Sequence, residues 1–361
     1  MRHFCTYFDV NYLTRGLALY QSLTQVSDQP FTLWILCFDE ASYRTLAALR
    51  LPAARLIRRS EFEAGDDALA VARGNRSSIE YYWTCTPSLP LYVFRQDASI
   101  EEVTYLDADL LFFSSPEPLY SEHRDWSILL VEHRYAPQHA VLQPLAGVYN
   151  VELLAFKRDE NGLAALQWWR ARCLEWCYQY VEDGKYGDQR YLDDWATRFA
   201  GVCVVTHDGA GVAPWNAARY WISEREGRLY VGNSPLVFFH FHAFVFIGDW
   251  ICVTDKNGYR VPRQYVRAVY GPYLHALQAA LAEVRAVDAG FDAGFTTLSM
   301  RDFLRFVEQR KVLMRPGGRL SRHVWVQFGR VRWPSLAEVK SELPGLLGRF
   351  LSRRTAKALG R

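Results

Sequence analysis

The stretch from Tyr105 to Phe113 (Tyr-Leu-Asp-Ala-Asp-Leu-Leu-Phe-Phe) sets two acids, Asp107 and Asp109, in an otherwise apolar run. The run predicts a buried strand over residues 103–113. An ionised carboxylate buried without a partner costs on the order of several kcal/mol, so these acids require a cation, hydrogen-bond donors or water. Side chains at i and i+2 of a strand share a face, so both carboxylates can reach one hard metal ion.

The predicted strand ends at Ser114-Ser-Pro116, so the two acids are expected near its carboxyl end. Open α/β sheets bind ligands at that edge. A divalent ion held there could bind a diphosphate. The alternative is a pair of solvated acids at a strand end, because a bare Asp-x-Asp is common in loops.

The composition is that of a soluble globular protein, with 361 residues of which 50% are hydrophobic and 22% charged. This length suits one large α/β domain with an appendage, or two modest domains. No run of 18 apolar residues occurs, which argues against a membrane-spanning helix. The chain starts directly with an expected strand, so we expect no signal peptide.

The cysteines indicate a reducing compartment. All seven lack a Cys-x-x-Cys spacing, and Cys173 and Cys177 lie one helical turn apart among apolar residues. We therefore expect buried free thiols. An odd number of cysteines without a disulfide framework is typical of an intracellular protein, so we expect a cytoplasmic one.

Hydrophobic periodicity predicts alternating strands and helices, and hence an α/β sandwich with a mainly parallel sheet flanked by helices. The expected strands cover residues 4–9, 31–38, 56–57, 103–113, 126–131, 148–157, 202–205 and 236–247. The expected helices cover residues 13–23, 41–49, 83–95, 161–181 and 262–287.

The C-terminal part has a different charge from the rest. Residues 301–361 carry 15 Lys and Arg against 4 Asp and Glu, a net charge of +11, which leaves −8 for residues 1–300. The turn-like Asp255-Lys-Asn-Gly258 suggests a boundary, giving a domain at 1–255 and a mainly helical, basic extension at 256–361.

Residues 343–354 of this extension mix apolar and cationic side chains. Such a segment suits peripheral contact with an anionic membrane surface or a lipid-linked acceptor. A packed helix with a basic tail is the alternative. Nucleic-acid binding is not expected, because the positive charge is confined to one end of the chain.

Five short segments together resemble one enzyme family. They are Tyr7-Phe-Asp-Val-Asn-Tyr12, Asp107-Ala108-Asp109, Gly147-Val-Tyr-Asn-Val151, Tyr186-Gly-Asp-Gln189 and Phe238-Phe-His-Phe-His-Ala243. Their order over residues 1–250 resembles the GT-A-fold (Rossmann-like) glycosyltransferases, nearest to the retaining family-eight type with its glycogenin-like and bacterial lipopolysaccharide galactosyltransferases. It is still more similar to bacterial proteins identified as nucleotide-diphospho-sugar transferases.

The resemblance implies a site for the nucleotide on the first segment. There an acid and an amide would read the base edge and an aromatic ring would stack on it, which assigns Asp9, Asn11 and Tyr12, with Tyr7 beside them. The alternative is a turn that caps the following helix.

The resemblance further implies that Asp107 and Asp109, with Ala108 between them, hold Mn²⁺ or Mg²⁺ against the diphosphate. The third ligand would be His240, from a His-aromatic-x-Gly motif in which Ala243 replaces the glycine. His242 shares the expected strand face and could reach the metal instead. Lone histidines in apolar strands are otherwise mostly core residues.

Three residues would touch the donor sugar. Asn150 would contact it through its amide, although Val151 and Glu152 follow where the family has small residues; the alternative is a turn Asn without a ligand. Asp188 would bind sugar hydroxyls, and the Gln189 amide would lie near the anomeric carbon. A plain helix N-cap is the alternative interpretation of Asp188, because Asp favours helix starts.

The chain departs from the family pattern at two places. The segment Tyr81-Tyr-Trp-Thr-Cys-Thr86 stands where the family often has a donor-binding Arg. Phe244-Val-Phe-Ile-Gly248 replaces a Lys-Pro-Trp whose Lys touches the diphosphate. Arg219 could substitute, and Trp215 and Asn216 are expected in a neighbouring site loop.

The implied function is a metal-dependent, hexosyltransferase-like glycosyltransferase. It would move a sugar from a nucleoside diphosphate-sugar, with UDP expected, to a glycan or lipid-linked acceptor hydroxyl with retention. Surface-polysaccharide synthesis is the setting that the resemblance suggests. One alternative is a non-catalytic nucleotide- or sugar-binding module of this fold. Another is an Asp-x-Asp phosphohydrolase, which Leu111 and the late position of the motif disfavour.

Overall fold

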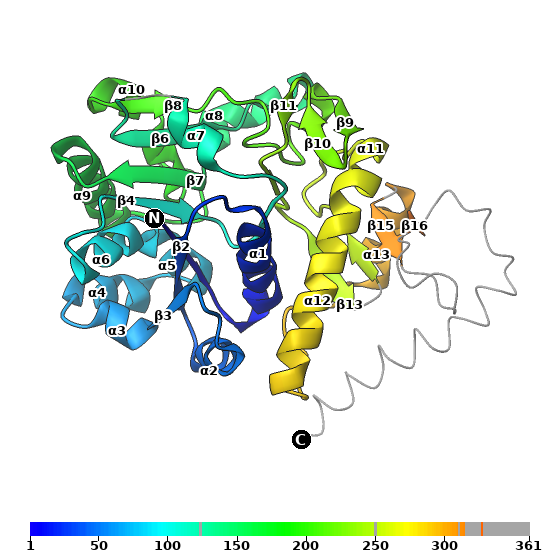
Figure 1. Ribbon diagram of the computed structural model, residues 1–361, viewed down its shortest axis with the longest axis horizontal. Coiled ribbons are helices and arrows are strands. Elements are labelled where there is room, and N and C mark those ends of the chain that lie inside the picture. The colour runs from blue at the N-terminus through cyan, green and yellow to red at the C-terminus, as the bar shows by residue number, and fades with distance from the viewer. Residues whose placement is uncertain (123–124, 249–250, 310, 315–325, 328–361) are drawn as a thin grey trace, which may run out of the picture.

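The computed structural model describes residues 1–122, 125–248, 251–309, 311–314 and 326–327. Its centre is a sheet with the strand order β3-β2-β1-β4-β7-β6-β8 (Figure 1). The bounds of these strands are β1 Arg2–Phe8, β2 Phe31–Cys37, β3 Ala54–Arg58, β4 Glu102–Leu106, β6 Ile128–Glu132, β7 Tyr149–Lys157 and β8 Val202–Val204.

The central sheet is mainly parallel. Strand β1 pairs in parallel with β2 and β4, β2 with β3, and β6 with β8. Strand β7 runs antiparallel between β4 and β6. Because β7 is reversed, its first residues lie at the same edge as the carboxyl ends of β1 and β4. The expected α/β class is confirmed.

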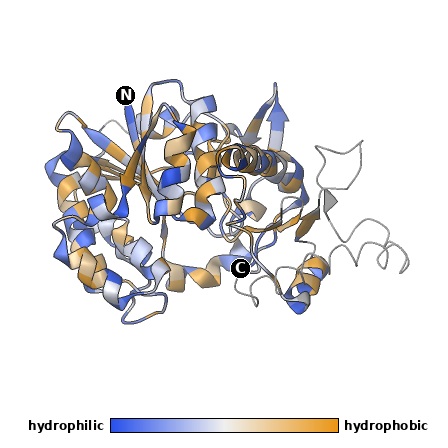
Figure 2. Ribbon diagram, turned by 90° about the horizontal axis from the view of Figure 1, so that it is seen from below, coloured by the Kyte–Doolittle hydropathy of each residue, from blue (hydrophilic) through white to orange (hydrophobic). Residues whose placement is uncertain are grey.

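Helices cover both faces of this sheet, and neighbouring residues of each strand enter opposite cores. In β2, Leu33 and Ile35 pack with one set of helices, and Trp34 and Leu36 with the other. The first set is α1 Leu13–Val26, α2 Glu40–Leu49 and α12 Gly271–Val287. The second set is α3 Arg59–Glu63, α4 Asp67–Asn75, α5 Ser78–Cys85, α6 Ser88–Gln96 and α9 Glu160–Glu175. Figure 2 shows helices that carry both hydrophilic and hydrophobic residues, as helices between core and solvent require.

The expected single strand over 103–113 is wrong. The chain leaves the central sheet after β4, turns at 107–109, and forms the separate strand β5 (Leu110–Phe112). Strand β5 pairs antiparallel with β12 (Phe238–His240) in a two-stranded sheet. The two acids therefore lie in a turn between strands, where their carboxylates escape full burial.

The expected strand over 236–247 is also two strands. It forms β12 and then β13 (Val245–Gly248), separated by a turn in which Ala243 has a φ of +58°. An antiparallel sheet of β13, β14 (Ile251–Val253), β15 (Val312–Met314) and β16 (Val326–Gln327) follows. The break separates His240, on the strand, from His242, in the turn.

Two helices also differ from expectation. The predicted helix over 83–95 is divided into α5 and α6, because Pro87 lacks the N–H that a continuous helix needs and precedes α6. The predicted helix over 161–181 ends at Glu175, after which residues 176–188 form a loop with a short Glu182–Lys185 bridge.

The remaining described elements are short, and two of them, α11 and η5, lead directly into α12. They are η1 Val10–Tyr12, α7 Glu117–Ser121, η2 Pro137–Leu142, α8 Gln143–Ala146, η3 Gln189–Leu192, α10 Trp195–Arg198, η4 Ala217–Arg219, β9 Ile222–Arg225, β10 Arg228–Val231, β11 Ser234–Pro235, α11 Arg263–Tyr265, η5 Val266–Tyr270 and α13 Met300–Glu308. Among the described residues, no helix is long and apolar enough to cross a membrane.

Helix α12 follows α11 and η5 without a break and lies beside α1, as Figure 1 shows in yellow and dark blue. Its Leu281 and Val284 enter the same core as the central strands. The domain boundary at residue 255 stays a prediction. The amphipathic segment 343–354 lies outside the described residues.

Gly16 of α1 packs tightly against Phe8 of β1. A Cβ placed there would lie 2.1 Å from the Phe8 ring, whereas Gly74 in α4 has nothing within 4 Å. We expect Gly16→Ala to destabilise the fold by about 1–3 kcal/mol through overpacking. Gly74→Ala, the matched control, should stabilise it by about 0.5–1 kcal/mol. Urea unfolding of both variants measures this; equal effects would contradict the tight α1–β1 packing.

Candidate metal and nucleotide-sugar site

A cleft of about 730 Å³ opens at the edge of the sheet where β1 and β4 end and β7 begins. Every metal, catalytic or nucleotide-binding residue expected from the sequence lines this cleft, except Asn216 and the possible substitute Arg219. The parallel pairing of β1 with β4 places Asp9 and Asp107 directly after neighbouring strands. The topology thus gathers segments that are far apart along the chain.

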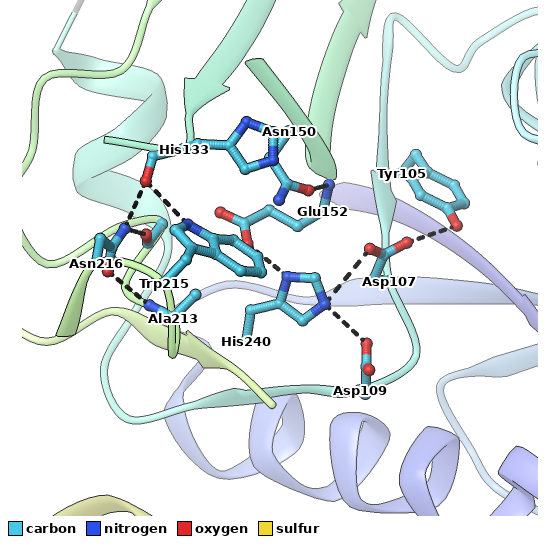
Figure 3. Close-up of polar contacts among 11 residues, drawn as sticks. Tyr105, Asp107, Asp109, His133, Asn150, Glu152, Ala213, Trp215, Asn216 and His240 are labelled. Atoms are coloured by element: carbon cyan, nitrogen blue, oxygen red, sulfur yellow. Dashed lines mark hydrogen bonds and ion pairs between the residues drawn. The ribbon is translucent and has the colours of Figure 1, made fainter. Parts of the chain in front are cut away.

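Asp107, Asp109 and His240 form a cluster in the cleft. One ligand atom from each lies within 4.8 Å of the other two. His240 Nε2 lies 3.2 Å from Asp109 Oδ1 and 3.7 Å from Asp107 Oδ2 (Figure 3). The cause is the β5–β12 pairing, in which His240 lies opposite Leu110.

The opposite side of the His240 ring is held by Glu152. Its Oε2 lies 2.7 Å from His240 Nδ1, and the Glu152 side chain is completely buried. Trp215 packs edge-on against His240 at 5.3 Å between ring centres, and its Nε1 donates to the carbonyl of His133. The imidazole is therefore fixed from two sides.

Burial and mutual charge perturb the acids and the imidazole of the cluster. Burial raises the pKa of Asp107 to about 6, opposed by His240 and reinforced by Asp109. Burial also disfavours the Asp109 anion, but the neighbouring His240 outweighs it and lowers the pKa of Asp109. Burial alone would lower the pKa of His240, yet Asp109 and Glu152 raise it well above its usual value.

The donor set fits a divalent cation. Two carboxylates and one imidazole match the oxygen and nitrogen preferences of Mn²⁺, and oxygen ligands suit Mg²⁺. The cluster faces the cleft, where diphosphate oxygens and water could complete the coordination.

His242 does not join this cluster. It lines the cleft, but its Nε2 lies 3.0 Å from Asn257 Nδ2. Burial and the neighbouring His240 lower the pKa of His242 to about 4, so its ring is neutral at pH 7. Of the two histidines left open by the sequence, the geometry favours His240.

The first segment lies on the cleft and also caps a short helix. Asp9 Oδ1 accepts the N–H of Asn11 at the start of η1, and Asp9 Oδ2 accepts from the Tyr82 hydroxyl at 3.2 Å. The Tyr12 ring is 40% exposed and stacks over the guanidinium of Arg15 at 4.5 Å. The segment therefore caps η1, as the alternative interpretation expects, and also lines the cleft.

Asp188 lies in the cleft as a buried, incompletely bonded carboxylate. Gly187, with a φ of +54°, turns the chain before it. Asp188 precedes η3, but its side chain makes no capping hydrogen bond, so the N-cap interpretation does not describe it. Its Oδ2 has no hydrogen-bond partner in the protein. Burial raises its pKa to about 7, against a hydrogen bond from Thr86 and with the help of Asp107.

Thr86 belongs to a row of hydroxyls between Asp188 and Asp107. The Tyr7 hydroxyl lies 2.9 Å from Thr86 Oγ1, and the Tyr105 hydroxyl donates to Asp107 Oδ1 at 2.9 Å. The rings of Tyr7 and Tyr105 are 5.5 Å apart. Tyr7 and Tyr105 line the cleft, so this row of hydroxyls lies along its wall between the two carboxylates.

Asn150 and Gln189 are tied to the backbone beside the cleft. Asn150 Oδ1 accepts the N–H of Glu152 at 2.8 Å, and Gln189 Nε2 donates to the carbonyl of Ala146 at 2.5 Å. Both side chains are thereby oriented before any ligand binds.

Asn216 and Arg219 lie away from the cleft. Asn216 is completely buried, and its amide bonds the carbonyls of His133 and Gly211 and the N–H of Ala213. Arg219 donates to the carbonyl of Arg134. Asn216 therefore holds the loop that carries Trp215, and neither residue is positioned for a ligand.

Sequence reasoning missed Glu152, Thr86 and Tyr105. Glu152 had a signal, because it is an acid within the apolar run of β7. Thr86 and Tyr105 had none, since their roles depend on neighbours from distant segments.

Two curated proteins of Bacillus subtilis (strain 168) match most of the chain. YfnF is 35% identical over 302 residues, covering 81% of this chain and 97% of YfnF. The chain belongs to the YfnF family. YfnD is 29% identical over 301 residues, covering 81% of this chain and 94% of YfnD. Both are described as uncharacterized proteins, and no family model matches this member of the YfnF family.

Solved glycosyltransferase structures are similar to this YfnF-family chain at low identity. A galactosyltransferase LgtC, in complex with donor and acceptor sugar analogues, is 17% identical with a TM-score of 0.47, covering 83% of this chain and 98% of LgtC. GlyE from Streptococcus pneumoniae TIGR4 is 13% identical with a TM-score of 0.44, covering 80% and 63%. At these values the likeness carries no statement about activity.

Asp188→Asn tests the buried carboxyl. Because its folded-state pKa is raised to about 7, the wild type loses stability as pH rises from about 4 to about 7. The Asn variant lacks this loss. We therefore compare the free energy of unfolding of the Asn variant with that of the wild type at each pH. This difference should favour the variant by at least about 1 kcal/mol more at pH 8 than at pH 5. Urea unfolding with EDTA at both pH values measures the difference; an equal difference at both would contradict the raised pKa.

His240→Ala and His242→Ala separate the two histidines. Substitution of a residue that only supports a metal ligand typically weakens metal binding by about 10–100-fold. Because His240 would be a ligand itself, we expect His240→Ala to weaken Mn²⁺ binding by more than that. His242→Ala should leave the Mn²⁺ dissociation constant within a few-fold. Titration of free Mn²⁺ by electron paramagnetic resonance measures both, and the reverse ranking would exchange their roles.

Proposed function

We propose that the protein is a metal-dependent glycosyltransferase of the GT-A type. It would transfer a sugar from a nucleoside diphosphate-sugar, UDP-sugar in the first instance, to an acceptor hydroxyl. The observation that carries this proposal is the Asp107–Asp109–His240 cluster, facing a 730 Å³ cleft at the carboxyl edge of a mainly parallel sheet.

The residues divide along the cleft by chemistry. Asp107, Asp109 and His240 would hold Mn²⁺ or Mg²⁺, which supplies Lewis-acid stabilisation of the charge on the leaving diphosphate. The Ala108 backbone lies between the two acids, where a diphosphate could approach it. Trp215 would form a wall beside the metal through its packing on His240.

The nucleotide would bind where β1 ends. Asp9 and Asn11 offer polar groups for the edge of the base, and the exposed Tyr12 ring offers a face for stacking. Tyr7 would support this end through its hydroxyl contact with Thr86.

The donor sugar would bind between Asp188, Asn150 and Gln189. The unpartnered Oδ2 of Asp188 is an acceptor aimed at no protein group, which suits a sugar hydroxyl. The Gln189 amide is uncharged and tied to Ala146, so it is a poor nucleophile. A covalent intermediate on Gln189 is therefore not expected. The retention that the resemblance implies would then proceed by a front-face route through an oxocarbenium-like state.

The cellular setting is also a proposal. Seven free cysteines suit a reducing cytoplasm. Residues 1–255 would be the catalytic domain, and the basic residues 301–361 suit an acidic membrane surface or a lipid-linked glycan acceptor in surface-polysaccharide synthesis.

A thermal-shift panel of UDP-, GDP- and dTDP-sugars tests the donor site. With Mn²⁺, one nucleotide class should raise the Tm of the wild type, because metal and diphosphate bind only the folded state. Asp109→Ala should lose this shift. Asp97→Asn, at the opposite edge of the sheet, is the matched control and should keep it. If no sugar nucleotide raises the Tm of the wild type, the assignment of the cleft as a donor site is wrong.

Product analysis separates an enzyme from a binding module. The wild type should hydrolyse the stabilising sugar nucleotide slowly in the presence of Mn²⁺, and transfer with an acceptor should give a product of retained anomeric configuration. Binding without any turnover would favour the module. An inverted product would contradict the front-face route.

A further inference from the structure

We infer that Glu152 is a positioning residue that sets the ring orientation and tautomer of His240 for metal binding. This inference rests on the proposed metal site. It concerns a residue that stands where the resemblance expects a small one, and it does not require Glu152 to touch metal or substrate.

The contact between Glu152 and His240 is direct and buried. Glu152 Oε2 lies 2.7 Å from His240 Nδ1, and the two side chains are 0% and 5% exposed (Figure 3). In the neutral ring, which is the form that binds a metal ion, donation of Nδ1–H to the carboxylate leaves the lone pair on Nε2. That nitrogen is the one that faces Asp107 and Asp109. A carboxylate behind an imidazole ligand fixes its tautomer and increases its basicity.

Glu152 also holds the other half of the cluster. Its backbone carbonyl accepts the N–H of Asp107 at 2.9 Å, where β4 ends. Its own N–H donates to Asn150 Oδ1 at 2.8 Å. One residue therefore connects the acid turn, the histidine and a candidate donor-sugar residue.

The local backbone is shaped to present this side chain. The register between β6 and β7 shifts between the pairs Val131↔Asn150 and Leu129↔Ala155, whereas β7 stays in register with β4. Glu152 lies within this irregular stretch. Such irregularities re-aim a side chain beside functional sites.

The Glu152 carboxyl group is completely buried, and only one of its oxygens has a hydrogen-bond partner. Its Oε1 has no partner in the protein, and neither have Nε and Nη2 of Arg134. Both Oε1 and Nη2 border Gly211, at 3.1 and 3.0 Å from the place where a Cβ would sit. The Arg134 guanidinium and the Glu152 carboxylate therefore border the same glycine, but no hydrogen bond joins Nη2 to Oε1.

A purely structural pairing is the rival explanation. Replacing a buried ion pair by apolar residues is often neutral or stabilising, so stability alone gives little reason for a carboxylate here. The two explanations differ in metal affinity, which a structural pair would not control.

The test is Mn²⁺ titration by electron paramagnetic resonance on the full chain, without nucleotide. Glu152→Leu should weaken Mn²⁺ binding by about 10–100-fold. Glu152→Gln keeps an oxygen that can accept from Nδ1–H but loses the charge, so it should weaken binding less, by about three- to tenfold. Glu117→Gln, which removes a carboxylate paired with Arg2 outside the cleft, is the matched control and should bind like the wild type.

Electron spin-echo envelope modulation gives a second readout. Wild type and Glu152→Gln should show the ¹⁴N coupling of a histidine ligand, and Glu152→Leu should show it weakened or shifted. Circular dichroism checks that each variant folds. Should Glu152→Leu not fold, Glu152→Gln decides alone, because an unchanged Mn²⁺ dissociation constant in that variant overturns the inference.

The outcomes separate this inference from the proposed function. If the wild type binds no Mn²⁺, the metal site fails and the inference fails with it. If the wild type binds Mn²⁺ and both Glu152 variants bind it equally well, the metal site stands and Glu152 is only a structural partner.

Discussion

The candidate site depends on the antiparallel pairing of β5 with β12. Without it, the acid turn at 107–109 and His240 would belong to unrelated parts of the chain. The pairing places His240 opposite Leu110, and the N–H of Phe241 donates to the carbonyl of Asp109 at 3.0 Å. On the same strands Phe112 and Phe238 pack at 5.5 Å in the main core. Hydrophobic burial thus holds the polar cluster in register.

The cluster works against the stability of the fold that carries it. Three carboxylates, those of Asp107, Asp109 and Glu152, surround one imidazole in a region of low exposure. Asp188 adds a fourth buried acid with an unpartnered oxygen. Repulsion and lost hydration cost free energy that a cation and a ligand could return on binding. Local rules of protein stability are expected to fail in this way at functional sites, while the two large cores on either side of the sheet supply the stability.

Much of the fold followed from the sequence because its strands are apolar and its helices are amphipathic. The expected elements of the parallel half, from β1 to β3, differ from the structure by a few residues at most. The acid pair was placed correctly at a sheet edge, but for a reason that does not apply. Asp107 and Asp109 do not share the face of one strand; a turn brings them together. No local pattern distinguishes that turn from a continuing strand, because residues 110–113 are as apolar as those before the acids.

The residues that sequence reasoning misplaced or missed depend on distant partners. Asn216 follows a Pro-Trp pair and suggests a site loop, yet its amide bonds carbonyls that are brought to it by the fold. Glu152 is visible as an acid in an apolar strand, but the sequence cannot tell whether it faces solvent, a ligand or a histidine. The register shift between β6 and β7 and the return of β12 decide that question together. Because Glu152 contacts both Asn150 and His240, the proposed metal and sugar ends of the cleft share one support. Substitution of either Asn150 or Glu152 should therefore change the affinity for the metal ion and the affinity for the donor sugar together.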